Sequence, residues 1–329
     1  METRQTKTPI FLPRWGLRGG HRQTLVNFIL PRHISLPAAE ARLIEVEPGV
    51  KVLAHCHWQS DRRDALTAIL VHGLEGSSES DYMLGIAAKG LALGMNVIRM
   101  NQRNCGGTDA LAPTLYHSGR SQDVAAVAQN LIEQDGISRF ALAGFSMGGN
   151  LVLKLAGEWE KAGPAQFCAV AAVCPALDLA ASADALHLPS NRLYELYFLW
   201  KLSHRFRAKA RLFPGAFDIS RLRGITSLRD FDDRITAYYC GFAGAPDYYD
   251  RAAGAHVVDR IAVPAYILNA ADDPFIRILP ETRRKILNNP NITFLETEDG
   301  GHCSFLAAAN GNDGHWAETQ IVEFLRRFM

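Results

Sequence analysis

The pentapeptide Gly144-Phe145-Ser146-Met147-Gly148 has the spacing G-x-S-x-G and separates an apolar strand-like run from an apolar helix-like run. A serine in this spacing acts as a nucleophile when it sits on a strained strand-to-helix turn, where the flanking glycines leave room for close neighbours. The pattern therefore predicts acyl-transfer chemistry at Ser146. So short a pattern also arises by chance in Gly/Ser-rich turns, and the prediction depends on further residues.

A serine nucleophile needs a histidine base and an acid that orients the histidine, in the chain order serine, acid, histidine for this type of turn. His302, in a glycine-rich loop after the last predicted strand, is the predicted base, because the alternative His315 resembles the start of the final helix. The candidate acids are Asp272 and Asp273, which directly follow a predicted strand. We prefer Asp273, since the position before Pro274 is expected to turn toward the site.

Acyl transfer also needs two backbone N–H donors for the developing oxyanion. Met147 supplies the first as the residue after the nucleophile, and Leu74, in a glycine-rich turn after an earlier strand, is the candidate for the second. His72 precedes the serine and is interpreted as shaping that turn through a backbone hydrogen bond. Cys105 and Cys303 lack the strand-turn-helix setting of a nucleophile and are predicted to take no part.

An alternation of strands and helices must position these residues, and no fixed-period repeat competes with it. Strand-like runs occur at residues 42–46, 51–55, 66–71, 96–100, 139–143, 167–173, 265–269 and 292–296. Helix-like runs occur near 81–93, 119–134 and 150–156, and from about Trp316 onward. The first two strands are expected to form a hairpin that turns at Pro48-Gly49. This pattern predicts an α/β fold with a mostly parallel, doubly wound sheet.

The alternation fails over residues 179–251, which we interpret as a helical insertion that covers the site as a cap. Its aromatic residues stand beside basic ones: Tyr194, Tyr197, Phe198 and Trp200, then Lys201, Arg205, Arg207, Lys209 and Arg211. One interpretation is an apolar acyl tunnel whose basic end meets lipid headgroups, which would give peripheral lipid contact. The other is a cap packed by its aromatics, with the charges on a solvated face.

The composition excludes several classes of protein. With 329 residues, 48% of them hydrophobic, the chain can fill a substantial core, and a formal net charge of +1 gives no global field for nucleic acid. The six cysteines are scattered without a C-x-x-C pair, unlike a zinc site or a disulfide framework, which favours a cytoplasmic location. The N-terminus lacks a secretion signal, and no apolar run is long enough to span a bilayer.

With these residues assembled, the chain resembles the α/β-hydrolase superfamily and, within it, the YheT-like family that includes animal abhydrolase-domain lipid hydrolases. The motifs that carry this resemblance are Gly20-His21-Arg22-Gln23-Thr24-Leu25, His72-Gly73-Leu74-Glu75-Gly76-Ser77-Ser78, Arg103-Asn104-Cys105-Gly106-Gly107-Thr108, Tyr116-His117-Ser118-Gly119, Gly144-Phe145-Ser146-Met147-Gly148-Gly149-Asn150 and Asp272-Asp273-Pro274. The resemblance covers nearly the whole chain. It implies a Ser146–Asp273–His302 triad, which favours Asp273 over Asp272, and hydrolysis of carboxylic esters, acyl lipids among them, without a metal or organic cofactor. The animal members carry an N-terminal membrane anchor that this sequence lacks, so a cytosolic, bacterial-type enzyme is expected.

The expected organisation has an N-terminal extension (1–45), a core (46–178 and 252–329) and a helical cap (179–251). The expected function is a serine hydrolase that cleaves short to medium acyl esters or acyl lipids through an acyl-serine intermediate. A thioesterase or an acyltransferase would use the same intermediate. A ligand-binding protein of this fold remains a third reading, although such proteins have usually lost a triad residue and none is missing here. The oligomeric state is left open.

Overall fold

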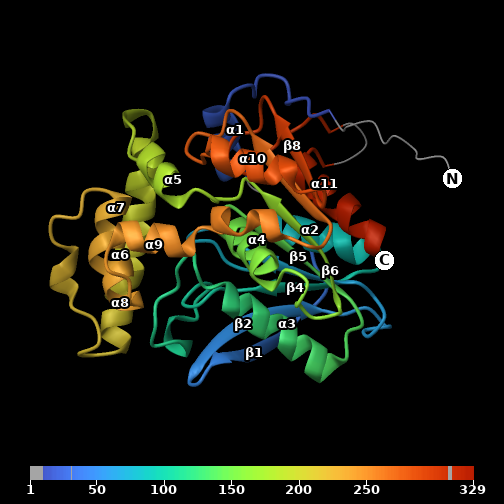
Figure 1. Ribbon diagram of the computed structural model, residues 1–329, viewed down its shortest axis with the longest axis horizontal. Helices are drawn as coiled ribbons and strands as arrows, with labels where there is room; N and C mark the ends of the chain where they lie inside the picture. The colour runs from blue at the N-terminus through green and yellow to red at the C-terminus, as the bar shows by residue number, and fades with distance from the viewer. Residues whose placement is uncertain (1–9, 31, 310–312) are drawn as a thin grey trace.

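The computed structural model of the chain describes residues 10–30, 32–309 and 313–329. The first eight residues, considered above for a secretion signal, lie outside these ranges. An eight-stranded sheet in the order β1-β2-β4-β3-β5-β6-β7-β8 forms the centre of the molecule (Figure 1). The strands are β1 (Glu40–Glu47), β2 (Val50–His57), β3 (Thr67–Val71), β4 (Asn96–Met100), β5 (Phe140–Phe145), β6 (Phe167–Val173), β7 (Ala265–Ala270) and β8 (Ile292–Thr297).

The sheet is parallel from β4 through β8, and only β2 pairs antiparallel, with β1 and with β4. The β1–β2 hairpin turns at the predicted dipeptide, where Gly49 has a φ of 75°. Every residue of β3, β4 and β5 is buried, as expected for parallel strands covered on both faces. The predicted mostly parallel sheet is therefore confirmed.

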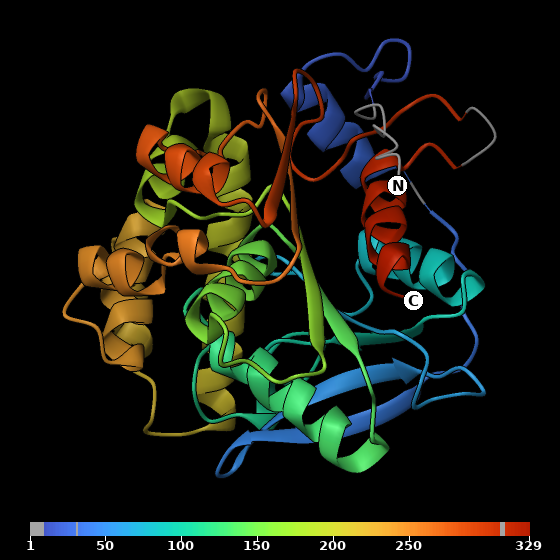
Figure 2. The same ribbon diagram turned by 45° about the vertical axis from the view of Figure 1, so that its right-hand side comes forward.

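Helices cover both faces of the sheet, which confirms the doubly wound arrangement. The helices outside the predicted cap are α1 (Gly20–Ile29), α2 (Asp81–Ala92), α3 (Ser121–Asp135), α4 (Met147–Trp159), α10 (Pro280–Asn288) and α11 (Trp316–Leu325). Helices α1, α2 and α11 lie on one side of the sheet, while α3, α4 and α10 lie on the other (Figure 2). The large buried core between these layers consists mainly of Val, Ile, Leu, Ala and Phe side chains.

The segment predicted to be a helical insertion is helical, and its helices gather at one side of the molecule (Figure 1). They are α5 (Leu179–Leu186), α6 (Arg192–Leu212), α7 (Leu228–Phe231), a π-helix (Asp232–Ala237), α8 (Tyr238–Cys240) and α9 (Ala245–Ala252). A second apolar cluster, distinct from the sheet core, lies between this cap and the sheet and includes Met147, Leu199, Phe206, Phe231 and Ile235. The cap is thus packed directly against the turn that carries Ser146.

The division expected at residue 45 needs correction. Strand β1 begins at Glu40 and pairs with β2 along its length, so the division falls inside a strand of the sheet. The strand predicted at residues 42–46 already spans this division, and the observed strand starts two residues earlier, where Glu40 and Ala41 are exposed and carry no apolar signal. At the other junction, α9 runs to Ala252, one residue past the expected end of the cap. Within the described ranges, no helix combines the length and the apolar character that crossing a membrane requires.

Candidate active site

Ser146 occupies the turn between β5 and α4 with a φ of 53° and a ψ of −118°, a strained conformation for a residue other than glycine. Its backbone N–H donates to the Val173 carbonyl (2.9 Å), and its carbonyl accepts from the Asn150 N–H (3.0 Å). A Cβ atom at Gly144 would overlap the backbone of Gly148, and one at Gly148 would overlap a carbonyl of β3. The tight turn therefore requires both glycines of the sequence pattern.

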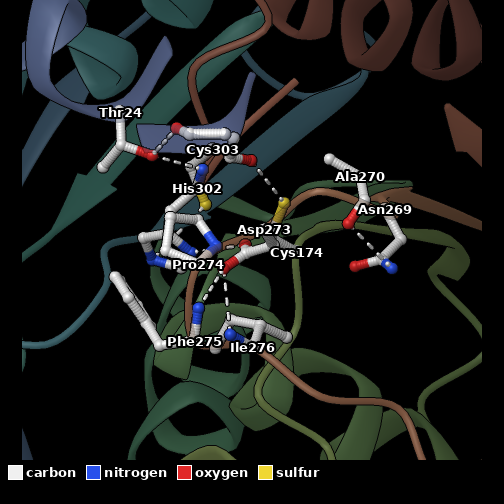
Figure 3. Close-up of polar contacts among 12 residues, drawn as sticks. Thr24, Cys174, Asn269, Ala270, Asp273, Pro274, Phe275, Ile276, His302 and Cys303 are labelled. Atoms are coloured by element: carbon white, nitrogen blue, oxygen red, sulfur yellow. Dashed lines mark hydrogen bonds and ion pairs between the residues drawn. The ribbon is translucent and has the colours of Figure 1, made fainter. Parts of the chain in front are cut away.

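The structure pairs His302 with Asp273 and not with Asp272. The Nδ1 atom of His302 donates to Asp273 Oδ2 (2.8 Å), as Figure 3 shows, while the other carboxylate oxygen accepts the backbone N–H groups of Phe275 (3.0 Å) and Ile276 (2.9 Å). Asp272 instead accepts a backbone N–H of the His302 loop (2.8 Å) and braces that loop. The role of Asp273 as the triad acid stays a prediction.

Ser146 and the His302 loop meet at the carboxyl end of β6. The Val173 carbonyl accepts both the Ser146 N–H (2.9 Å) and the Cys303 thiol (3.5 Å). The Ser146 hydroxyl forms no hydrogen bond within the residues that the structure describes, so its contact with His302 stays a prediction. Such contacts are often long or poorly aligned without substrate and tighten when it binds.

The protonation of His302 is coupled to that of Cys303, whose sulfur lies 3.9 Å from Nε2. Burial lowers the pKa of His302, but the charges of Cys303 and Asp273 outweigh it and raise the pKa. Burial raises the pKa of Cys303, while its hydrogen bond with Cys174 and the charge of His302 bring it down to about 6. The pair can thus hold one proton on either partner, and only neutral imidazole can accept a proton from serine.

The two residues predicted to supply the oxyanion donors belong to the same pocket as Ser146. Leu74 and Met147 both line it, and over the described ranges neither backbone N–H donates to another group. The Gly73 N–H donates to the Tyr82 hydroxyl (3.0 Å), which fixes the turn that carries Leu74. A Cβ atom at Gly73 would lie 3.2 Å from Ser146 Cβ, so glycine keeps the two turns close together.

His72 shapes this turn, as the sequence suggested. Its Nδ1 donates to the Gly73 carbonyl (2.8 Å), and its Nε2 accepts the Gln102 backbone N–H (3.1 Å). Complete burial lowers the pKa of His72 to about 4, so the ring is neutral at pH 7. With both nitrogens engaged, His72 is not available as a general base.

The pocket in front of Ser146 is mainly apolar and is closed by cap residues. Its apolar lining includes Leu74, Met147, Phe198, Leu202, Phe206 and Phe231. Polar groups are also present, among them Ser118, Asp232, Thr236 and Tyr248. A pocket of this composition suits a hydrocarbon chain whose reactive end lies at the serine.

The aromatic residues of the cap do not all roof this pocket. Of the four, Phe198 lines it, whereas Trp200 is 64% exposed. Tyr194 stacks on His21, with ring centroids 5.8 Å apart, and Tyr197 packs against an aromatic ring of α1. The tunnel interpretation therefore holds for one aromatic residue, and two others connect the cap to the N-terminal helix.

Two of the basic cap residues point inward, contrary to the reading of a solvated charged face. Arg205 binds both carboxylate oxygens of Glu75 (2.9 and 3.0 Å), and the Tyr116 hydroxyl donates to the same carboxylate (2.6 Å). Lys209 is fully buried and donates to the Asp109 carbonyl (2.9 Å). These side chains join α6 to loops of the core, which local charge patterning could not reveal.

Helix α1 supports the His302 loop, a role that the sequence reasoning missed. The His302 backbone N–H donates to Thr24 Oγ1 (2.8 Å), visible in Figure 3. The buried Gln23 side chain accepts the Leu306 N–H (2.7 Å) and donates to the Leu306 carbonyl (3.2 Å). Gln23 and Thr24 belong to the N-terminal motif on which the family resemblance partly rests. That motif was the available signal, but the spacing of its residues does not indicate what they contact.

Comparisons with known proteins identify the fold and the family. A family profile described as alpha/beta hydrolase fold matches residues 69–309. The chain is 28% identical over 325 residues to YheT of Escherichia coli strain K12, and the match covers 97% of this chain and 94% of that protein. The name of that protein describes it as an esterase on a provisional basis. Phospholipase ABHD3 of Mus musculus is 30% identical over 244 residues, covering 73% of this chain but 58% of the mouse protein.

Among solved structures, the Pyrococcus furiosus esterase Pf2001 resembles the chain with a TM-score of 0.57 and 16% identity, covering 90% of this chain and 98% of the other. At that identity the likeness shows the fold alone. The expected fold and family are both confirmed by these matches. The chain belongs to the alpha/beta hydrolase fold family and, within it, to the YheT-like group of abhydrolase-domain proteins.

Proposed function

We propose that the chain is a serine hydrolase that cleaves carboxylic esters, with Ser146 as nucleophile, His302 as base and Asp273 as the acid that orients the base. The observation that carries the proposal is the position of Ser146 on a strained turn at an apolar pocket. The loop of the hydrogen-bonded Asp273–His302 pair meets this turn at the Val173 carbonyl, which supports the assignment of the base and the acid. The esterase and phospholipase names of its relatives support the same reaction class.

In the proposed reaction, Ser146 Oγ attacks the ester carbonyl carbon while His302 Nε2 takes the hydroxyl proton. The backbone N–H groups of Leu74 and Met147 stabilise the oxyanion of the tetrahedral intermediate. The intermediate collapses, the C–O bond of the ester breaks, and His302 returns the proton to the departing alcohol. Water then attacks the acyl-serine with His302 again as base, which releases the carboxylic acid and regenerates Ser146.

The pocket favours a substrate with an apolar acyl group. The pocket at Ser146 lies between core loops and helices α5 to α7, and the wall contributed by these helices is mainly Leu and Phe. Burying each methylene of an acyl chain gains about 0.8 kcal/mol until the pocket is full. We therefore expect kcat/KM to rise with chain length and then level off or fall at the length that fills the pocket.

The test measures hydrolysis of p-nitrophenyl esters from acetyl to palmitoyl, together with labelling by a fluorophosphonate probe. Ser146→Ala should lose labelling and lower turnover at least about 10³-fold, because the acyl-enzyme cannot form. Ser138→Ala is the matched control, since Ser138 is an exposed serine that precedes β5 at the end opposite the nucleophile. Turnover that persists in Ser146→Ala would refute the proposal, and stoichiometric ester binding without turnover would favour a binding protein.

A further inference from the structure

Two cysteine thiols lie beside the imidazole of His302, although they come from distant parts of the chain. Cys174 follows β6 directly, and Cys303 follows His302 in the loop after β8. The two sulfur atoms and a ring nitrogen of His302 all lie within 4.8 Å of one another, and Figure 3 shows the three side chains converging. In the described part of the chain this is the one group of three such ligands. The sequence pattern, with no paired cysteines, gave no sign of it.

Backbone contacts hold the two thiols in place from both sides. The Cys174 thiol donates to the Gly301 carbonyl (3.7 Å), and the Cys303 thiol donates to the Val173 carbonyl (3.5 Å). The end of β6 and the His302 loop are thereby linked crosswise. Both cysteines adopt left-handed backbone conformations, with φ of 43° at Cys174 and 58° at Cys303, which few residues other than glycine occupy. Such conformations persist where the surrounding structure fixes them.

Two thiolates and one imidazole form a ligand set that suits Zn²⁺, with the fourth position of a tetrahedron left open. Bond lengths of about 2.3 Å to sulfur and about 2.0 Å to nitrogen place these two atoms about 3.5 Å apart around a tetrahedral ion. The separation of Cys303 Sγ and His302 Nε2 is 3.9 Å, so small side-chain adjustments suffice. Nδ1 of His302 already donates to Asp273, the arrangement that orients most metal-bound histidines.

We propose that Cys174, Cys303 and His302 form a Zn²⁺ site that inhibits the enzyme when occupied. Binding forms two Zn–S bonds and releases two protons, one from Cys174 and the one that Cys303 and His302 share, and it engages the lone pair of His302 Nε2. The same lone pair must accept the Ser146 proton in the proposed reaction. Inhibition thus rests on the proposed function, whereas metal binding does not, so the two are measured separately.

Metal binding is tested with Co²⁺ as a spectroscopic substitute and with Zn²⁺ in competition with a chromophoric chelator. The wild-type chain should bind one ion and show thiolate-to-cobalt charge-transfer absorption. Cys303→Ser and Cys174→Ser should each remove most of this absorption and weaken Zn²⁺ binding at least about 100-fold, while Asp273→Asn weakens it about 10- to 100-fold. Cys168→Ser is the matched control on the same strand, β6, and should bind as the wild type does.

The inhibitory effect is measured as Zn²⁺-dependent loss of ester hydrolysis and its reversal by EDTA, in wild type and in Cys303→Ser. We expect at least about tenfold loss at saturating Zn²⁺ in the wild type, because the base is blocked. If ester hydrolysis is absent but the cobalt spectrum appears, the metal site stands and the proposed function falls. The absence of thiolate-to-cobalt absorption in the wild type would overturn the proposed metal site. Zn²⁺ binding by Cys174→Ser and Cys303→Ser as tight as in the wild type would overturn it too.

If the Cys174→Ser and Cys303→Ser variants fail to fold, metal binding can still be tested in the wild type. In the wild type, Zn²⁺ should protect the partly exposed Cys303, and not Cys168, from iodoacetamide, with the labelled peptides identified by mass spectrometry. Equal labelling of Cys303 with and without Zn²⁺ would overturn the proposal.

Discussion

At the scale of single residues, the neighbouring carboxylates of Asp272 and Asp273 have different hydrogen-bond partners. Asp273 accepts from His302 Nδ1, whereas Asp272 accepts a backbone N–H of the loop that carries His302. An asparagine at either position keeps the size of the side chain and changes only its charge and donors. The two asparagine variants therefore allow a matched comparison. One tests the orientation of the His302 ring, and the other tests the support of the His302 loop.

Asp273→Asn should lower kcat about 10³- to 10⁴-fold, because an amide can present N–H to Nδ1 and then favours the wrong tautomer of His302. Asp272→Asn keeps an oxygen acceptor for the loop and should lower kcat less than about tenfold. The measurement is kcat and KM on the best ester, with melting temperature to check the fold. Equal losses in the two variants would contradict the assignment of Asp273.

Asp232 is a buried carboxylate whose ionisation should affect stability. Its oxygens accept the hydroxyls of Tyr249 (2.7 Å) and Thr236 (2.8 Å), yet burial raises its pKa to about 6. The native state then holds this proton more tightly than the unfolded chain, whose Asp pKa is about 3.9. The stability contributed by Asp232 is therefore present at low pH and falls as pH rises from about 4 to about 6, by about 2 to 3 kcal/mol.

The measurement is the free energy of unfolding by urea at pH 4.5 and pH 7.0 for the wild type and Asp232→Asn. Other groups titrate in both proteins, so the quantity that matters is the difference between them. We expect the wild type to gain stability relative to Asp232→Asn at the lower pH. A difference that does not change with pH would show that Asp232 keeps an ordinary pKa.

At the scale of elements, the β5–α4 turn depends on glycine for space and not for chemistry. A Cβ atom at Gly148 would overlap a carbonyl of β3, which is fixed in the centre of the sheet. Gly148→Ala should cost more than about 3 kcal/mol or prevent soluble expression, because neither the strand nor α4 can retreat without losing packing. Ser146→Ala adds no atoms to the same turn and should keep the wild-type melting temperature within a few degrees.

The two variants separate folding from chemistry when they are compared by thermal unfolding and by ester hydrolysis. Ser146→Ala should be folded and inactive, whereas Gly148→Ala should lose both fold and activity. A stable, fully active Gly148→Ala would show that the turn has more room than the structure gives it.

At the scale of the whole molecule, a buried ion pair fastens the cap to the core. Arg205 of α6 binds Glu75, the residue after the proposed oxyanion donor Leu74, and the two side chains are only 16% and 3% exposed. The pair therefore links the position of the cap to the geometry of the oxyanion turn. Its loss should affect both stability and substrate preference.

Arg205→Met should destabilise the protein by about 3 to 5 kcal/mol, because it leaves the Glu75 carboxylate buried and unpaired. The double variant Glu75→Gln/Arg205→Met removes both charges and should recover much of that loss. Urea unfolding measures the stability, and the ester chain-length profile reports on the pocket. A double variant no more stable than Arg205→Met would indicate that the pair contributes little to the attachment of the cap.

The parts of this protein that depend on neighbours along the chain can be read from its amino-acid sequence. The turn at Ser146, the hairpin at Pro48-Gly49 and the order of strands and helices follow from glycine spacing, apolar periodicity and turn chemistry over a few residues. The strands and four helices outside the cap lie near the predicted ranges, whereas β1 starts earlier than predicted, and α1 and α10 have no predicted counterpart. The candidate acid was narrowed to two adjacent aspartates in the same way.

The folded structure brings together groups that are distant in the sequence. It paired His302 with Asp273, placed Thr24 behind the His302 loop, turned Arg205 inward, and brought Cys174 beside Cys303. Each of these contacts joins segments that are far apart in the sequence, so it depends on how the whole sheet and cap pack and not on local propensity. Local patterns carry no information about such approaches, because the same short segment can face many different partners in different folds.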